Sequence, residues 1–324
     1  MLQAKILKEL LADGRKTDSE IAKKIAETEE NVKRNIGEME EKGIITGATI
    51  HINYKIFGYK AVAYISINVD SKQEAQLIEY LRKMPEVYSL HSRGVKGNLD
   101  VVIILKTLEQ LNYIKDAIKR HFLILEMRTA IWTDVKEMNQ NLAITSTDKK
   151  NEEAEINYQV NTQKKSNSQT MIMDGIDKKI ADKLSENGRV SMETLGREIG
   201  LTSAAANRRY EKLKKNGVLK ATIQINPIKI GYRALCVFFT VTSHENSFLL
   251  IEKISKIPDV ISIMKTTGDY DLQIYAMLKD IDQLLFIQKE IGKISGITRM
   301  DMEVLGFEEG RAKWPSPRQY ISTF

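Results

Sequence analysis

The sequence predicts an α+β protein built twice on one plan, with a winged helix-turn-helix followed by a βαββαβ domain in each copy. The duplication is visible in one phrase, since EKGIITGATIHINYKIFGY at 41–59 returns as KNGVLKATIQINPIKIGY at 215–232. Each copy passes from helical periodicity to the alternation that is typical of strands. Between the copies, residues 145–170 hold 14 Ser, Thr, Asn or Gln residues and little apolar periodicity. A period this long indicates a duplicated domain pair and not a solenoid.

Length and composition are those of a globular protein with more than one core. The chain has 324 residues, of which 42% are hydrophobic and 28% charged. No run approaches the roughly 18 apolar residues that a membrane helix needs. The single cysteine, Cys236, excludes an internal disulfide and fits a reducing compartment. The net charge of +6 hints at an anionic partner. We therefore expect a cytoplasmic protein that makes no membrane contact.

The two copies align over nearly their whole length, at an offset of about 173 positions. Ala48 matches Ala221 and Pro85 matches Pro258. A polar segment joins the copies, and its composition predicts a flexible tether. The predicted segments are 1–53 (winged helix-turn-helix), 57–138 (first βαββαβ domain), 143–172 (linker), 173–226 (second winged helix-turn-helix), 230–306 (second βαββαβ domain) and 307–324 (tail, packed on the surface or free).

Three short helices open each copy. In the second copy apolar residues recur at helical spacing, as in Ile176, Ile180 and Leu184, and Gly-containing breaks separate the three runs. Gly217 follows the third run, where a helix C-terminus favours a residue free to take the left-handed conformation. The strand-like VLKATIQIN comes next. Two helices joined by a tight turn and followed by a β-rich pair predict a winged helix-turn-helix.

The rest of each copy alternates as a ferredoxin-like unit. In the second copy we expect strands at ALCVFFTVTS, DVISIMKT, DLQIYAMLK and ITRMDMEVL, and helices at NSFLLIEKISK and DIDQLLFIQKEIGK. The order βαββαβ is that of the split βαβ fold. A Gly-x-x-Asp loop, from Gly268 to Asp271, comes before the third strand.

This ordered combination resembles the Lrp/AsnC transcriptional regulators, and it occurs twice. The residues that carry the resemblance are LTSAAANRRYEKLKKNGVL, the junction ATIQINPIKIGY and the segment TTGDYDLQIYAML. The resemblance implies a DNA-binding regulator modulated by a small metabolite such as an amino acid. Family members pair their ferredoxin-like sheets, which closes exposed strand edges. We therefore expect an intrachain pseudo-dimer that also forms homo-oligomers, with double-stranded DNA as partner.

The third helix of the second copy has the composition of a DNA-reading helix. Residues 200–216 contain five basic residues and one acidic residue. A cap, small residues, an amide and cations suit phosphate contact and base readout. The predicted DNA-binding residues here are Thr202, Ser203, Asn207, Arg208, Arg209 and Lys212.

The corresponding helix of the first copy is acidic. Residues 26–42 contain six acidic and three basic residues, and acids at the helix N-terminus repel phosphate. Lys33 and Arg34 are the candidate DNA contacts that remain. We expect this copy to bind DNA weakly or to contact protein instead.

The Gly-x-x-Asp loop of the second copy is the predicted effector site. A glycine lets backbone N–H groups approach a carboxylate, and an Asp can pair with an ammonium group. The predicted effector-binding residues are Thr266, Gly268, Asp269, Tyr270 and Asp271. In the first copy the ungapped alignment places Val95, Lys96, Gly97 and Asn98 at the four loop positions, whereas a two-residue shift would restore Gly97-x-x-Asp100. We prefer the ungapped version and so expect one better-kept site per chain.

Enzyme chemistry has little support in the sequence. The four histidines share no metal-ligand spacing, no phosphate-binding loop or nucleophile elbow occurs, and we assign no catalytic residue, metal or cofactor. The sirohaem decarboxylases resemble Lrp/AsnC proteins and provide an alternative. His91 and Arg93 are the candidate residues for that chemistry. A second alternative is a subunit that does not bind DNA and partners other Lrp-like proteins.

Overall fold

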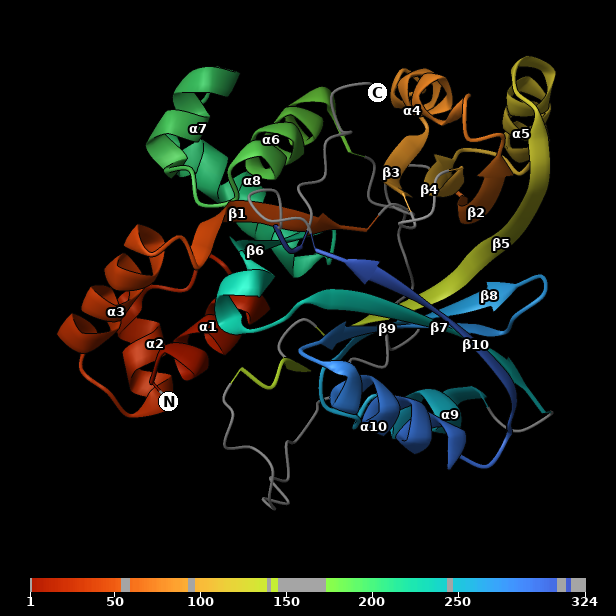
Figure 1. The fold of residues 1–324 in the computed structure, drawn as a ribbon. Coiled ribbons are helices and arrows are strands. Elements are labelled where there is room, and N and C mark those ends of the chain that lie inside the picture. Colours follow the sequence, from red (N-terminus) through yellow and green to blue (C-terminus); the bar gives the residue numbers. More distant parts are fainter. Residues whose placement is uncertain are drawn as a thin grey trace.

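The computed structural model describes residues 2–53, 59–92, 97–138, 141–144, 173–243, 247–307 and 313–315. The predicted linker therefore lies outside the described residues from position 145 onward, as does most of the predicted tail. No helix in these ranges is long and apolar enough to cross a membrane. The fold class is the predicted one, because winged helix-turn-helix and βαββαβ elements occur in both copies (Figure 1).

Each copy runs through the same order of elements. The first copy consists of α1 (Leu2–Ala12), α2 (Asp18–Ile25), α3 (Glu29–Glu41), β1 (Ile45–Ile52), β2 (Ala61–Val69), α4 (Glu74–Arg82), β3 (Val87–Ser92), β4 (Asn98–Leu105), α5 (Glu109–His121) and β5 (Ile124–Glu137). The second consists of α6 (Gly175–Glu186), α7 (Met192–Ile199), α8 (Ser203–Lys215), β6 (Leu219–Ile225), the 3-10 helix η3 (Pro227–Ile230), β7 (Ala234–Thr242), α9 (Ser247–Ile254), β8 (Val260–Thr267), β9 (Leu272–Leu278), α10 (Ile281–Gly292) and β10 (Ile297–Gly306). We call α1–α3 the N-terminal head and α6–α8 the C-terminal head.

Local chemistry explains the tight turns of both heads. Thr28 and Thr202 cap α3 and α8, and each side chain accepts a hydrogen bond from the backbone N–H three residues on. The preceding helices end in the left-handed conformation, at Ala26 (φ 58°) and Gly200 (φ 76°). Gly217 has a φ of +66°, as its predicted place after α8 requires. The two helix-turn-helix units thus share one geometry, although Ala26 adopts it without a glycine.

The repeated phrase forms a two-stranded ribbon between the heads. Strands β1 and β6 pair antiparallel, with Thr49 opposite Thr222, and these two residues are equivalent in the two copies. The Thr49 hydroxyl donates to the carbonyl oxygen of Ser185 at the end of α6, at 3.0 Å. The Thr222 hydroxyl donates to the carbonyl oxygen of Leu11 at the end of α1, also at 3.0 Å. The copies are therefore related by a pseudo-twofold axis through this ribbon, and each threonine binds the head of the other copy.

Two glycines complete the junction of the heads with the ribbon. The Gly14 N–H donates to Ala221 O at 2.8 Å, and the Gly188 N–H donates to Ala48 O at 3.0 Å. The ribbon also supplies apolar side chains to both cores, since Ile50 packs among the C-terminal helices and Ile223 among the N-terminal helices. Neither head has a complete core without the other copy's strand, so the heads are one structural unit (Figure 1).

The two ferredoxin-like domains share one eight-stranded sheet. Its order is β10-β7-β9-β8-β5-β2-β4-β3, and the domains join where β5 pairs antiparallel with β8. Helices α4 and α5 cover the sheet of the first domain, and α9 and α10 cover that of the second (Figure 1). The sheet faces that point away from the helices meet in an aromatic layer, in which the rings of Tyr64 and Phe239 are 5.8 Å apart. Burying such side chains stabilises the pairing by about 1.5–3 kcal/mol each.

The strand register settles the alignment of the two Gly-x-x-Asp regions. Ser66 pairs with Asp100 in the first domain, and the equivalent Phe239 pairs with Gln273 in the second. Ser66 and Phe239 are 173 positions apart in the chain, and so are Asp100 and Gln273. The ungapped alignment therefore holds, and Asp100 takes the place of Gln273, not that of Asp271.

Candidate nucleic-acid interface and effector cavity

The exposed face of α8 carries four of the six DNA contacts predicted for the second copy. Ser203, Asn207, Arg208 and Lys212 are exposed, and Arg208 and Lys212 lie one helical turn apart on the same face. Lys215 is also exposed and continues this face toward the C-terminus of the helix. The buried side of α8 holds Ala206, Tyr210 and Leu213, which fix the helix against the core of the head. The arrangement leaves three cations and two hydrogen-bonding side chains available to an anionic polymer.

Two other predicted contacts have structural partners inside the C-terminal head. The Arg209 guanidinium donates to Asp174, the N-cap of α6, at 2.7 Å and to Asp177 in the first turn of that helix at 2.8 Å. Hydrogen bonds to these two carboxylates raise the pKa of Arg209. The Thr202 hydroxyl accepts the Ala205 N–H as the helix cap. Arg209 therefore holds α6 against α8, and the sequence offered no sign of this because Asp174 lies 35 positions away.

The N-terminal head presents a different surface. Lys33 and Arg34 are exposed on α3, and the Arg34 guanidinium donates to the Asn31 amide oxygen at 2.9 Å. Glu29 and Glu30 are exposed in the first turn of the same helix. The two candidate cations thus stand beside carboxylates that repel phosphate.

The Gly-x-x-Asp loop is a tight connection between β8 and β9. The Thr266 hydroxyl donates to Tyr270 O at 2.6 Å, and the Asp271 carboxylate accepts the N–H of Thr242 at 2.7 Å and its hydroxyl at 3.1 Å. Gly268 has a φ of +127°, and a Cβ there would lie 2.9 Å from Thr129 O of the first domain. Thr266, Gly268 and Asp271 therefore shape the loop and dock it on β5.

Asp269 and Tyr270 of this loop line a cavity of about 520 Å³ between the two ferredoxin-like domains. The residues that line it are Tyr64, Ser66, Arg128, Thr129, Ala130, Phe239, Asp269, Tyr270, Gln273, Arg299, Asp301, Met302 and Glu303. Most of them were not predicted, because they come from strands far apart in the sequence. A buried glutamine within the apolar strand DLQIYAML was the one available signal.

The cavity lies on the pseudo-twofold axis of the chain. Arg128, Thr129 and Ala130 of β5 are the equivalents of Asp301, Met302 and Glu303 of β10, and all six line it. In a symmetric dimer the two walls would be identical. Here the three β5 residues carry one cation, whereas their three β10 equivalents carry two carboxylates, so the site of the duplicated chain is asymmetric.

Polar groups inside the cavity are positioned with unused hydrogen-bonding capacity. Gln273 is 1% exposed, and its Oε1 accepts the indole N–H of Trp132 at 2.9 Å. Among the residues that the structure describes, Gln273 Nε2 and Thr129 Oγ1 have no hydrogen-bond partner. A buried amide N–H without a partner is costly, so a polar ligand or water there satisfies it.

Hydrogen bonds and a cation stacked on a tyrosine ring hold the residues at the mouth of the cavity. The Arg299 guanidinium lies 4.9 Å from the centre of the Tyr270 ring and donates to Asp269 O at 3.3 Å. The Tyr270 hydroxyl donates to Asp301 at 2.8 Å, and burial followed by that hydrogen bond raises the pKa of Tyr270. These contacts fix the loop residues that face the cavity.

The first domain has no matching loop in the described residues. Gly97 takes the place of Tyr270 and Asn98 that of Asp271, and a Cβ on Gly97 would lie 2.3 Å from Val69 O. Positions 93–96 lie outside the described residues, and so does Arg93 of the decarboxylase alternative. His91 is on β3 opposite Asp100 and does not line the cavity.

Models of known protein families match three segments of the chain. A winged helix-turn-helix DNA-binding model matches residues 2–46, an AsnC-type helix-turn-helix domain matches 173–214, and an Lrp/AsnC ligand binding domain matches 235–305. These segments correspond to the two heads and the second ferredoxin-like domain.

Curated relatives resemble one copy at a time. The HTH-type transcriptional regulator LrpA of Pyrococcus abyssi is 30% identical over 131 residues, which cover 40% of this chain and 93% of that protein. The HTH-type transcriptional regulator FL11 of Pyrococcus furiosus is 29% identical over 127 residues, which cover 39% of this chain and 84% of that protein. The chain belongs to the Lrp/AsnC family, and it carries the family's architecture twice.

Two solved structures match the chain over almost its whole length. The crystal structure of the siroheme decarboxylase NirDL aligns with a TM-score of 0.61 and 15% identity, and the alignment covers 99% of this chain and 96% of that one. Its complex with an iron-uroporphyrin III analogue aligns with the same TM-score and 14% identity, covering 99% and 95%. At this identity the likeness concerns the fold alone.

Proposed function

We propose that the protein is a DNA-binding transcriptional regulator of the Lrp/AsnC type, in which α8 of the C-terminal head is the main reader. The observation that carries the proposal is the exposed face with Asn207, Arg208, Lys212 and Lys215 on the element that a helix-turn-helix offers to the major groove. Asn207 suits a bidentate contact to adenine, and Arg208 suits guanine or phosphate. The names of the curated relatives support this assignment.

The central cavity is the proposed effector site. A small zwitterion such as an amino acid would place its carboxylate toward Arg128 and its ammonium group toward Glu303 on the opposite wall. The Gln273 amide N–H would donate to the ligand, since Nε2 has no other hydrogen-bond partner among the described residues. Both domains line the site, so a bound ligand would favour one arrangement of the two copies.

The test of DNA reading is a fluorescence-anisotropy titration on genomic duplex fragments at several salt concentrations. Removing two phosphate contacts in Arg208→Ala/Lys212→Ala should weaken binding and flatten the slope of log K against log salt by about 1.8, at roughly 0.9 per contact. Lys33→Ala/Arg34→Ala is the matched control on α3 and should change the slope little. Equal losses in both variants would show that both heads bind DNA and would contradict the asymmetric assignment.

A second candidate function is that of a sirohaem decarboxylase. The end-to-end match in fold favours it, because that structure aligns with both copies at once, whereas each regulator above covers less than half of the chain. The cavity lining fits it poorly. A tetrapyrrole with several carboxylates needs cations, and here Arg128 and Arg299 face three acidic residues, Asp269, Asp301 and Glu303.

Visible absorbance separates the two candidates. Sirohaem or iron-uroporphyrin added to the protein should leave its band unshifted if the cavity takes a small zwitterion. A shifted band together with loss of carboxylate groups from the added tetrapyrrole would establish the enzyme. Absence of DNA binding by the wild type at low salt would remove the regulator, and without a tetrapyrrole shift the partner-subunit alternative would remain.

A further inference from the structure

The cations of α8 fall into two groups that the sequence does not distinguish. Arg208, Lys212 and Lys215 are exposed. Lys214 instead reaches the N-terminal head, where its Nζ lies 2.8 Å from Asp13 Oδ2, and its side chain is 35% exposed. Burial alone would lower the pKa of Lys214, but the hydrogen bond and attraction from Asp13 raise it overall. One cation of the proposed DNA-reading helix is thus neutralised by the other copy.

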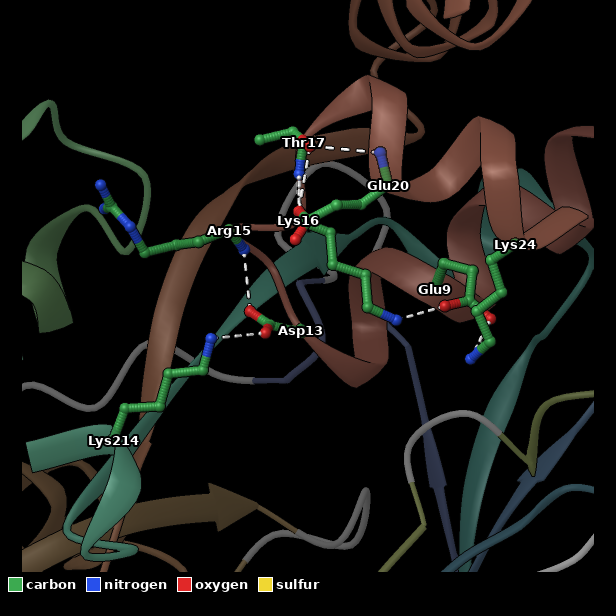
Figure 2. A network of polar contacts seen from close by, with 8 residues as sticks. All are labelled: Glu9, Asp13, Arg15, Lys16, Thr17, Glu20, Lys24 and Lys214. Carbon is green, nitrogen blue, oxygen red and sulfur yellow. Dashed lines mark hydrogen bonds and ion pairs between the residues drawn. The ribbon is translucent and has the colours of Figure 1, made fainter. Parts of the chain in front are cut away.

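Asp13 is held firmly in the loop between α1 and α2 (Figure 2). Its Oδ1 accepts the backbone N–H of Arg15 at 3.1 Å. The Arg15 guanidinium reaches into the C-terminal head and donates to Gly188 O and Val190 O, each at 2.9 Å. It also lies 5.2 Å from the centre of the Tyr210 ring of α8. The loop that carries Asp13 is therefore fastened to the head whose lysine it binds.

The backbone beside Asp13 is equally constrained. The Gly14 N–H bonds to Ala221 O of the ribbon, and a Cβ at Gly14 would lie 2.6 Å from the carbonyl carbon of Thr222. The backbone beside Asp13 is thus held against the ribbon, and the Asp13–Lys214 contact breaks if the lysine side chain turns toward another partner.

Lys214 also faces a surface where a phosphate could be bound. A shallow hollow of about 630 Å³ lies at the C-terminal end of α8, and it is lined by Glu211, Lys212, Lys214, Lys215 and Asn216. The hollow has room for a phosphate group. Lys212, Lys214 and Lys215 line it together with Glu211, and the Lys214 ammonium group is paired with Asp13. A DNA phosphate and Asp13 would therefore compete for Lys214.

We propose that Asp13 of the N-terminal head restrains Lys214 of α8, so that the first copy lowers the DNA affinity of the second. The inference rests on the proposed DNA-binding function of α8 and adds a role for the first head. Breaking the Asp13–Lys214 pair frees one more cation for phosphate. The N-terminal head then acts on DNA binding without itself reading the duplex.

A double-mutant cycle tests the restraint, with anisotropy titrations of the full chain on one duplex at several salt concentrations. Asp13→Asn should raise the affinity about threefold to tenfold and steepen the salt slope by about 0.9, which corresponds to one added phosphate contact. Lys214→Met should leave both quantities near the wild-type values in the wild-type background. In the Asp13→Asn background, the same substitution should abolish the whole gain.

Two controls keep the outcomes distinct. Asp116→Asn removes an exposed carboxylate on α5 and changes the net charge equally, so it should not steepen the slope. Lys215→Met should flatten the slope by about 0.9 in both backgrounds.

If the wild type binds DNA and Asp13→Asn behaves like Asp116→Asn, the restraint is wrong and the proposed function stands. If Lys214→Met alone flattens the slope, Lys214 already contacts DNA and the restraint is again wrong. Absence of wild-type binding overturns both proposals.

Discussion

The junction between the heads depends on single residues whose size is decisive. A Cβ on Gly188 would lie 2.3 Å from Thr49 O, whereas a Cβ on Gly175, at the start of α6, would meet no atom within 4 Å. Both glycines stand in ordinary backbone regions, so the difference between them is one of space.

Gly188→Ala should therefore destabilise the protein by about 1–3 kcal/mol, because the ribbon must move to admit a methyl group. Gly175→Ala is the matched control and should be neutral or stabilising by about 0.5–1 kcal/mol, because alanine is the better helix former. Urea unfolding followed by circular dichroism measures both. Equal urea midpoints for the two variants would contradict the close packing of the C-terminal head on the ribbon.

Asp182 on α6 gives the C-terminal head a dependence on pH. Burial, and then repulsion by Glu186, raise the pKa of Asp182 to about 6. The protonated form is thus favoured in the folded state. Its contribution to stability is complete below the unfolded pKa near 4 and is lost as the pH rises through 6.

Asp182→Asn should remove this loss of folding stability at high pH, because asparagine stays uncharged. The variant should be more stable than the wild type by about 1 kcal/mol at pH 8, after allowance for solvent screening of a half-buried group. The two proteins should unfold at similar temperatures near pH 4. Thermal melts across pH 4–8 measure the difference, and parallel curves for the two proteins would contradict it.

Whole elements explain why the two heads differ although their folds agree. Helices α3 and α8 are both capped by threonine and both follow a left-handed turn, so backbone geometry does not separate them. Surface charge does, because Glu29 and Glu30 open α3 while α8 opens with Ser203 and small residues. The predicted contrast in salt slope between the two double variants therefore reports side-chain chemistry alone.

The molecule as a whole has the architecture of a dimer whose two subunits are copies within one chain. The β1–β6 ribbon, the β5–β8 pairing and the aromatic layer all join the first copy to the second. None of these contacts requires the covalent connection between the copies. The connection raises their effective concentration and removes the entropic cost of meeting.

Cleavage at a protease site inserted within 145–172 should therefore leave the two fragments associated. We expect them to elute together on gel filtration at micromolar concentration, because each head needs the ribbon strand of the other fragment to complete its core. The uncleaved inserted variant is the control. Separate elution of folded fragments would show that the copies are independent units.

Much of this fold was predictable, whereas the site was predictable only in part. Helical spacing, threonine caps and the βαββαβ alternation are local signals, and they indicated the elements of both copies. Of the predicted effector residues, Asp269 and Tyr270 line the cavity, whereas Thr266, Gly268 and Asp271 hold the loop in place. Tyr64, Arg128 and Arg299 escaped notice because their strands meet only after the sheet forms.

The sequence by itself determined the duplication, the order of elements and the opposite charges of α3 and α8, since all of these depend on residues close together in the chain. Only the tertiary structure decided which copy each strand joins, because strands of similar propensity offer many pairings and loop closure discriminates weakly between them. The tertiary structure also decided which basic side chains of α8 are exposed and which are paired with a carboxylate. Arg208 is exposed, Arg209 is bound to Asp174 and Lys214 to Asp13, because the nearest carboxylate in space is far away in sequence.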